Sequence, residues 1–182
     1  MACSIMSSNH KRIWPALAAV VVGAWLMAPL TAAYAAQPVT AEATVTFAGP
    51  KTYTLPAGDD QAHVVGLGQR KGKAVFKDGR TATYSNVFFM DLYRGKGVTL
   101  WGYTKMTFKD GSWFYFKRDS KFAGRDQAGA PMFQGTGTIL KGSGKYQGIT
   151  GTLKYRNKRV GPSKDFPKGA TQAQVVMTYT LP

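Results

Sequence analysis

Apolar and polar residues alternate along most of the chain after residue 40, in short segments separated by Gly, Pro and Asp residues. In the segment 98–108, for example, Val98, Leu100 and Met106 fall on one face of an extended chain. A period of two is typical of a β-strand that buries one face, and no convincing helical period occurs among these segments. The pattern predicts strands at residues 41–47, 51–55, 63–69, 74–77, 81–85, 87–93, 98–108, 112–118, 133–140, 149–155 and 175–181.

Turn residues stand between these segments at regular intervals. Asp78-Gly79 and Asp110-Gly111 are strong signals for tight hairpins, because both residue types tolerate positive φ angles. The basic run 70–73 also predicts a turn, and the polar segments 119–131 and 161–169 predict loops. Many short strands at this spacing predict an all-β fold, a single antiparallel up-and-down β-barrel of about eight strands.

The stretch from Gly135 to Tyr155 carries six glycines between β-forming residues. Gly135 and Gly137 share one face of an alternating strand with Phe133. Glycine inside a strand usually marks the close approach of another backbone or side chain, as at a bulge or a barrel corner. The run 142–145 lacks the spacing of a phosphate-binding P-loop, and no helical pattern follows it. The glycines therefore predict strong local curvature of the sheet.

A resemblance to a known family rests on the same stretch. The run GTGTILKGSGKYQGITG, preceded by Phe108-Lys109-Asp110-Gly111-Ser112, resembles the allene oxide cyclase barrel-like family of small exported bacterial proteins. That family shares the barrel of the plant allene oxide cyclases and resembles the dirigent proteins. The resemblance extends from Phe108 to Tyr155 and implies a dirigent- or calycin-like barrel. No catalytic residue of the plant cyclases matches a position in this chain, so the resemblance implies the fold and leaves the activity open.

The N-terminal segment has the order of an export signal. Lys11 and Arg12 precede an apolar run over residues 13–30, and Ala33-Tyr34-Ala35 forms a small-residue cleavage site. We therefore expect a cleavable signal peptide at 1–35, a single β-barrel domain at 36–182, and a periplasmic or secreted location. A retained membrane anchor is the alternative, which the short, alanine-rich run disfavours.

Two scarce residue types exclude several kinds of site from residues 36–182. Cys3 is the chain's only cysteine and lies in the leader, so the domain has no disulfide or catalytic thiol. His63 is then the only histidine, which excludes a site with several histidine ligands. The pair Asp59-Asp60 is typical of a solvated turn rather than a cation site. The sequence therefore predicts neither a metal nor a cofactor.

Positive charge is the strongest feature of the composition. The chain has 24 Lys and Arg residues against 9 Asp and Glu, and the leader removes two cations, which leaves 22 − 9 = +13. Such a surface attracts anionic lipid head groups, anionic glycans or nucleic acid, although the charge also serves solubility. The candidate polyanion-binding residues lie in two basic runs, both predicted as turns: Arg70, Lys71, Lys73, Arg156, Lys158 and Arg159.

Aromatic residues gather on the two neighbouring segments 98–108 and 112–118. Because alternate residues face opposite sides of a strand, one set fills the barrel and the other lies outside it. The alternation predicts inward positions for Leu100, Gly102, Phe114 and Phe116, and outward positions for Trp101, Tyr103, Trp113 and Tyr115. The outward row, among Lys105, Lys117 and Arg118, is open to three readings: a homo-oligomer interface, cross-strand packing alone, or a stacking surface for a ligand.

A ligand cavity inside the barrel is the function that the sequence favours. Barrels of about eight strands either fill their interior or hold one small ligand. The predicted inward residues mix bulky and small side chains, which places a pocket beneath the glycines: Phe89, Leu100, Gly102, Phe114, Phe116, Gly135 and Gly137. We therefore expect an exported, non-catalytic barrel that binds a small apolar or amphipathic ligand.

Two other functions stay open at this level. One is a basic surface module that binds polyanions, and the other is a cyclase- or isomerase-like enzyme that uses the barrel cavity. Asp91 lies among apolar residues and is the chief candidate for an acid or base, although pairing with Arg94 or a lysine is the simpler interpretation. His63 in a polar loop has no predicted partner. Since no recognised catalytic constellation occurs, binding is favoured over catalysis.

Overall fold

The computed structural model describes residues 36–49 and 51–182, which belong to one compact unit. The predicted signal peptide lies outside the described residues. Apart from one short 3-10 helix, η1, at Gly144–Tyr146, the regular secondary structure of the described residues is all strand. The strands are β1 Val39–Ala48, β2 Lys51–Pro56, β3 His63–Phe76, β4 Thr81–Tyr93, β5 Gly97–Phe108, β6 Trp113–Arg125, β7 Pro131–Ser143, β8 Thr150–Val160 and β9 Ala170–Thr180. No helix among the described residues is long and apolar enough to cross a membrane.

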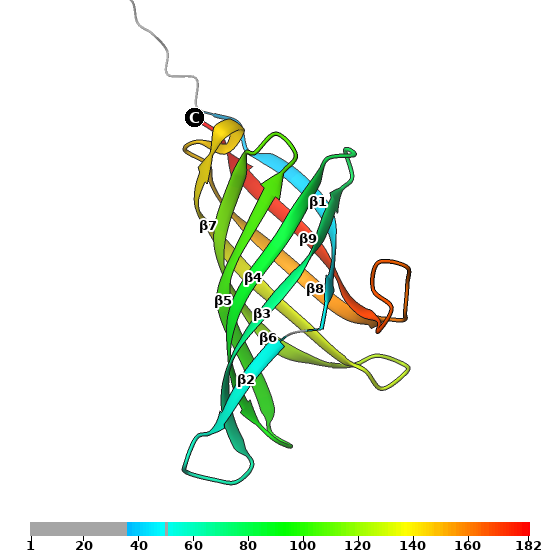
Figure 1. The fold of residues 1–182 in the computed structure, drawn as a ribbon. Helices are drawn as coiled ribbons and strands as arrows, with labels where there is room; N and C mark the ends of the chain where they lie inside the picture. The colour runs from blue at the N-terminus through cyan, green and yellow to red at the C-terminus, as the bar shows by residue number, and fades with distance from the viewer. Residues whose placement is uncertain (1–35, 50) are drawn as a thin grey trace, which may run out of the picture. The chain divides into compact units, whose positions relative to one another are not determined.

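The strands form a closed antiparallel barrel. From β3 to β9 each strand pairs with the next, and β1 pairs with both β9 and β3, so β1 and β3–β9 make a ring of eight (Figure 1). The ninth strand, β2, continues from β1 and pairs with the first half of β3. The all-β, up-and-down barrel predicted from the sequence is therefore confirmed, with one extra strand.

The two Asp-Gly hairpins form as predicted. Gly79 and Gly111 have φ angles of 87° and 82°, in the left-handed region that glycine adopts without steric cost. The Asp78 carboxylate accepts a hydrogen bond from the backbone N–H of Arg80 at 3.0 Å. These local interactions place the β3–β4 and β5–β6 turns at the same end of the barrel as η1 (Figure 1).

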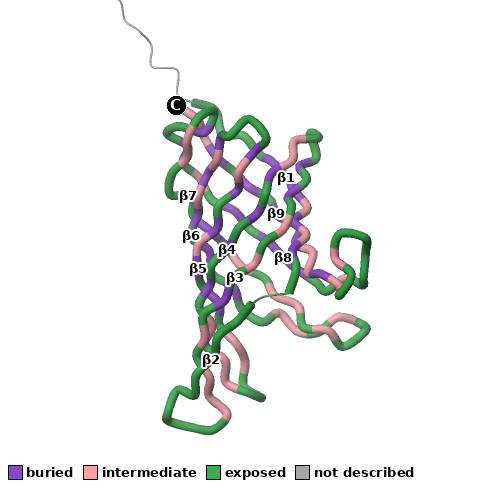
Figure 2. The backbone as a smooth tube through the Cα atoms, viewed as in Figure 1, coloured by how far each residue is buried: buried purple, intermediate pink, exposed green. Residues whose placement is uncertain are grey.

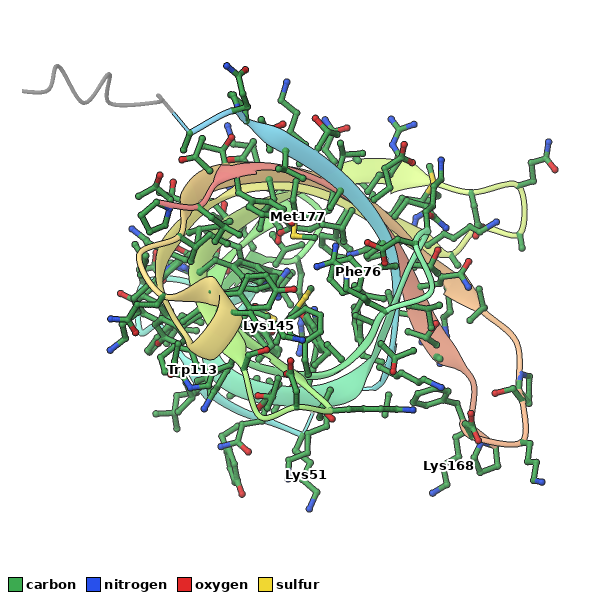
Figure 3. All side chains as sticks on the ribbon, turned by 90° about the horizontal axis from the view of Figure 1, so that it is seen from above. Lys51, Phe76, Trp113, Lys145, Lys168 and Met177 are labelled. Carbon is green, nitrogen blue, oxygen red and sulfur yellow. The ribbon has the colours of Figure 1, made fainter. Side chains whose placement is uncertain are left out.

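Buried and exposed residues alternate along the strands of the barrel (Figure 2). Phe76 of β3 and Met177 of β9, which are far apart in the sequence, both lie inside the ring of strands (Figure 3). Burial of such side chains contributes roughly 25 cal/mol per Å² of apolar surface. The core therefore depends on alternate residues of every strand in the ring: among the largest fully buried are Val45, Phe88, Met106 and Met177.

The glycines of the 135–155 stretch let neighbouring groups pack against the backbone. A Cβ atom at Gly135 would collide with the carbonyl oxygen of Asp119 and lie 2.7 Å from the Tyr155 hydroxyl. A Cβ atom at Gly137 would lie 3.1 Å from the side chain of Leu153. The register of β6 and β7 also shifts by one residue beside Tyr115, which is a β-bulge. These features account for the predicted curvature.

Predicted boundaries within β3 and β6 are wrong. Residues 70–73 are not a turn, because β3 runs without a break from His63 to Phe76. Gly72 lies there because β1 approaches closely, and a Cβ atom would collide with the carbonyl oxygen of Thr46. Residues 119–125 belong to β6 rather than to a loop. In both places pairing with the neighbouring strands of the sheet extends a segment whose local sequence suggests an end.

The close approach at Gly135 makes a specific stability prediction. We expect Gly135→Ala to lower the free energy of unfolding by roughly 1–3 kcal/mol, the usual cost of overpacking, because the new methyl group meets backbone. The matched control is Gly161→Ala, where no atom lies within 4 Å of the added Cβ. Urea denaturation of the two variants checks the difference. Equal stability of both would contradict the packing role of Gly135.

Candidate functional site

The two ends of the barrel differ in how they are filled. At the end that carries η1, the buried Tyr146 ring packs against Phe108 and Phe114, with ring centroids 4.8 and 5.3 Å apart. The guanidinium of Arg80 donates a hydrogen bond of 2.6 Å to the Tyr146 hydroxyl. Aromatic side chains therefore cover the interior at this end.

The opposite end contains an open cavity of about 560 Å³. Its walls come from β2–β7 and are mainly apolar, with Phe88, Met90, Leu92, Val98, Leu100 and Phe133 among the lining residues. Three cations also line it: Arg70 from the middle of β3, Lys96 from the β4–β5 turn and Arg125 from the end of β6. No lining residue is a carboxylate.

Arg70 lies at the inner part of this cavity rather than on a surface turn, which corrects its predicted place. It shares the inward face of β3 with Gly68 and Gly72. Its guanidinium carbon lies 4.2 Å from the ring centroid of Phe88 and 5.2 Å from that of Phe47. The Nε atom is buried and has no hydrogen-bond partner among the described residues.

A second arginine, Arg118, lies deeper inside the barrel, with 4% of its surface exposed. One terminal nitrogen donates to the Tyr155 hydroxyl at 3.0 Å, and the other donates to the Asn86 side-chain oxygen at 2.8 Å. Its Nε is buried without a partner in the described part of the chain. The placement of Arg118 among outward residues is therefore wrong. Its position follows from the inward Phe114 and Phe116, since all three have the same parity on β6.

Burial and mutual repulsion act on the interior arginines. Removal from water, and to a lesser extent the charge of Arg118, lower the pKa of Arg70 to about 10. Arg70 is therefore still cationic at neutral pH. None of the ion pairs within residues 36–49 and 51–182 includes Arg70 or Arg118. Burial lowers the pKa of Arg118, but the influence of Tyr84, Tyr155 and the Asp119 carboxylate outweighs it and leaves that pKa raised. The barrel interior thus holds two positive charges, neither of which forms a direct ion pair with a described residue.

The pocket that the sequence places beneath Gly135 and Gly137 is filled. The side chains of Tyr155 and Leu153 occupy that space. What is left near Arg118 is a void of about 20 Å³, the size of one water molecule. Of the inward residues proposed for the cavity, Leu100 lines the open one, Phe116 lines the void, and Phe114 and Gly102 pack inside the barrel.

The predicted inward position of Phe89 is wrong. Phe89 lies on the outside with 36% of its surface exposed, and Phe88 is the inward residue with 1% exposed. Phe88 stands between Gly68 on β3 and Gly102 on β5, which are its direct partners in the ladders. A Cβ atom at either glycine would collide with Phe88. The two glycines therefore leave space for an inward ring at residue 88, and the neighbouring Phe89 points outward.

The outward aromatic residues pack against one another across neighbouring strands. Cross-strand packing was one of the three interpretations that the sequence left open. Tyr103 and Tyr115 stack with ring centroids 5.6 Å apart, and Trp101 stacks on Phe89 at 4.1 Å. The ammonium of Lys105 lies 4.6 Å from the ring centroid of Trp113. A homo-oligomer interface on this face stays a prediction.

The barrel brings the two basic runs together on its outer face. Both lie in strands, not turns: Lys71 and Lys73 on β3, and Arg156, Lys158 and Arg159 on β8. Across the ladder, Lys73 is opposite Thr46, Thr46 is opposite Gln172, and Gln172 is opposite Lys158. Arg159 has the opposite parity and borders the 161–169 loop. Four of the six predicted residues therefore share one exposed face.

His63 joins two hairpin tips near the open end. Its Nδ1 donates to Asp59 at 2.7 Å and its Nε2 donates to Asp91 at 2.9 Å. These hydrogen bonds, that to Asp59 first, raise the pKa of His63 above its ordinary value of 6.5. Asp91 lies on the outer face and pairs with His63, rather than with Arg94 or a lysine as the sequence suggested. Sequence reasoning missed this pair because 28 residues separate its members.

The raised pKa of His63 predicts a pH dependence. Because the folded state favours the charged ring, its stabilising effect is complete below about pH 6.5 and is lost as pH rises through the folded pKa. An NMR titration of the imidazole should show a pKa above 6.5, and Asp91→Asn should move it downward. Hydrogen-exchange protection at the hairpin tips, measured relative to the intrinsic exchange rate at each pH, should decrease over the same pH range. A pKa at or below the ordinary value would contradict the double pairing.

Comparisons with known proteins assign no family. No known family model matches the chain, and no curated protein matches it in sequence. The computed structure is similar to that of a pterocarpan synthase dirigent protein, with a TM-score of 0.40 and 14% identity over 81% of this chain and 88% of that one. The resemblance of residues 108–155 to the allene oxide cyclase barrel-like family therefore stays a prediction.

Proposed function

We propose that residues 36–182 form an exported, non-catalytic barrel that binds one small apolar or amphipathic ligand in the cavity at its open end. The observation that carries this proposal is the open cavity of about 560 Å³, which is larger and more apolar than the pocket of about 460 Å³ at the η1 end, where Lys109, Asp110 and Lys145 are among the lining residues. Ligand pockets in proteins usually measure about 300–1,000 Å³ and have mainly apolar walls with few polar groups. The cavity has both properties.

The chemistry of the lining supports binding rather than catalysis. Met90, Leu92 and Val98 are half-buried and face the cavity, so a ligand that covers them removes apolar surface from water. General acid or base chemistry needs a titratable group within reach of the reacting atoms. Asp91, the candidate for that role, is exposed on the outer face and engaged by His63. The enzyme alternative therefore lacks its chief base.

A cavity-filling variant tests the proposal. Phenylnaphthylamine, a neutral apolar fluorescent probe, should bind the purified protein saturably with enhanced emission. Met90→Trp places a large ring in the cavity and should weaken probe binding at least tenfold. Val87→Trp is the matched control, because residue 87 lies on the same strand but faces outward. Saturable binding that neither variant changes would place the site elsewhere, and the absence of saturable binding by the wild type would refute the proposal.

A basic binding surface is a second candidate function, favoured by the shared outer face of β3 and β8. Lys71, Lys73, Arg156 and Lys158 are exposed there, and neutral Thr46 and Gln172 stand between them. A row of cations without interposed acids matches the spaced charges of an anionic polymer. This function uses the outside of the barrel and is compatible with a ligand inside.

Paired charge changes separate this surface from the general positive charge. The double variant Lys73→Gln/Lys158→Gln should bind heparin or duplex DNA more weakly, with a salt dependence shallower by roughly one to two units of log–log slope. Lys117→Gln/Lys141→Gln removes the same charge from exposed positions on β6 and β7 and serves as the control. Heparin-affinity elution and salt titrations measure both. If the two double variants weakened binding equally, the basic face would act only through the net charge of the protein, and this second candidate function would be contradicted.

A further inference from the structure

We infer that the cavity ligand carries one negatively charged oxygen acid, a carboxylate or a sulfonate, and that this group enters first and binds Arg70. The inference rests on the proposed function, since it concerns the same cavity. It adds the charge, the orientation and the recognising residue of the ligand. Three observations carry it: two interior arginines without a direct ion pair in the described part of the chain, the unpartnered donor of Arg70, and the distribution of polar groups along the cavity.

The first observation is the positive charge of the two arginines inside the barrel. Arg118 is buried among the neutral oxygens of Tyr155 and Asn86, and half-buried Arg70 is stacked on Phe47 and Phe88. No carboxylate of the described residues forms an ion pair with either. A cation removed from water without a counter-charge is destabilising, and an anion beside it removes much of that cost. The protein therefore favours an anionic group near Arg70.

The donors of the two arginines are not equivalent. Both terminal nitrogens of Arg118 already donate within the barrel and only its Nε is without a partner among the described residues, so Arg118 contributes charge but not a free fork. Arg70 lines the cavity, and its Nε is buried without an acceptor. A planar guanidinium matches an oxygen acid with two parallel hydrogen bonds. The guanidinium of Arg70 alone offers one pair of N–H donors. This matches a singly charged acid better than a phosphate monoester, which carries more charge and needs more donors.

The position of Arg70 sets the orientation of the ligand. It lies in the middle of β3, whereas Lys96 and Arg125 belong to the turn and strand end at the cavity mouth. Between them the walls are apolar, with Met90, Leu92 and Val98. A ligand with an acid at one end and an apolar body therefore fits with its acid inward. The cations at the mouth attract an anion from solution and do not select its apolar part.

Three ten-carbon probes that differ only in their end group test the inference. Decanoate, decanesulfonate and decanol are titrated against the complex of wild-type protein with phenylnaphthylamine. We expect decanoate, decanesulfonate or both to displace the neutral probe at a concentration at least ten times lower than decanol does. The preferred acid identifies the oxygen acid. Equal potency of all three would overturn the inference, while binding of the neutral probe would still support the proposed function. If the neutral probe does not bind at all, the proposed function fails and this inference fails with it.

Substitution of Arg70 locates the recognition. Arg70→Met should abolish the preference for the acids, with at least a tenfold loss for the preferred acid and little change for decanol. Arg125→Met is the matched control, because it removes the same charge at the mouth, where Arg125 donates to the carbonyl oxygen of Gly129 at 2.7 Å. It should change the acid affinity less than threefold. A preserved preference in Arg70→Met, or an equal loss in both variants, would overturn the assignment to Arg70.

A measurement on the wild type keeps the inference testable if Arg70→Met does not fold. The carboxyl carbon of ¹³C-labelled decanoate reports its own ionisation by NMR. A carboxylate held beside Arg70 should show a pKa lowered relative to free decanoate, because the guanidinium favours its charged form. An unchanged or raised pKa in the complex would show that the acid end lies away from Arg70 and would overturn the inference.

Discussion

The fold depends on one closing strand. β1 pairs with β9 along its whole length and with the last part of β3, from Gly72 to Phe76. Without β1 both β3 and β9 would be edges with unpaired backbone groups, and the interior would be open to water along one side. Closure of the ring by β1 buries Arg118 and Asn86. Because buried polar groups need hydrogen-bond partners within the protein, these two side chains bond to each other.

The place where β1 leaves β3 decides where the cavity is. β1 pairs with β3 as far as Gly72, and β2 pairs with it from Gln69 toward its start. Arg70 lies between these two pairings, at the level where the ring of eight strands ends. Beyond it β2–β6 continue, and β4 and β5 end in the hairpin that carries Lys96. The core is therefore packed on one side of Arg70 and open, with an apolar wall, on the other, because β3 changes its partner from β1 to β2 at this level.

Glycine has a second role in this architecture, because it makes room for large groups. Phe88 lies flat between Gly68 and Gly102, and Arg70 stacks on the ring. Tyr155 lies against Gly135, and its hydroxyl accepts from Arg118. The small residues that suggest an empty pocket in the sequence are instead partners of bulky ones. The open cavity lies where the closed ring ends, not where glycines are most frequent.

The sequence by itself determined the class of fold and much of the barrel lining. The alternation in β5 and the first part of β6 placed Leu100, Gly102, Phe114 and Phe116 inward, and the Asp-Gly pairs located two turns, because these signals act between neighbouring residues. The same alternation on β3 puts Arg70 on one face with Gly68, Gly72 and Ala74. The inward position of Arg70 was therefore predictable from the alternation, but the basic residues around it indicated a surface turn instead. Only the tertiary structure decided the parity of β4, the continuity of β3 and the contact of His63 with Asp91. Each of these depends on which distant strand pairs with which, and at which register, and that is a property of the closed barrel rather than of any one segment.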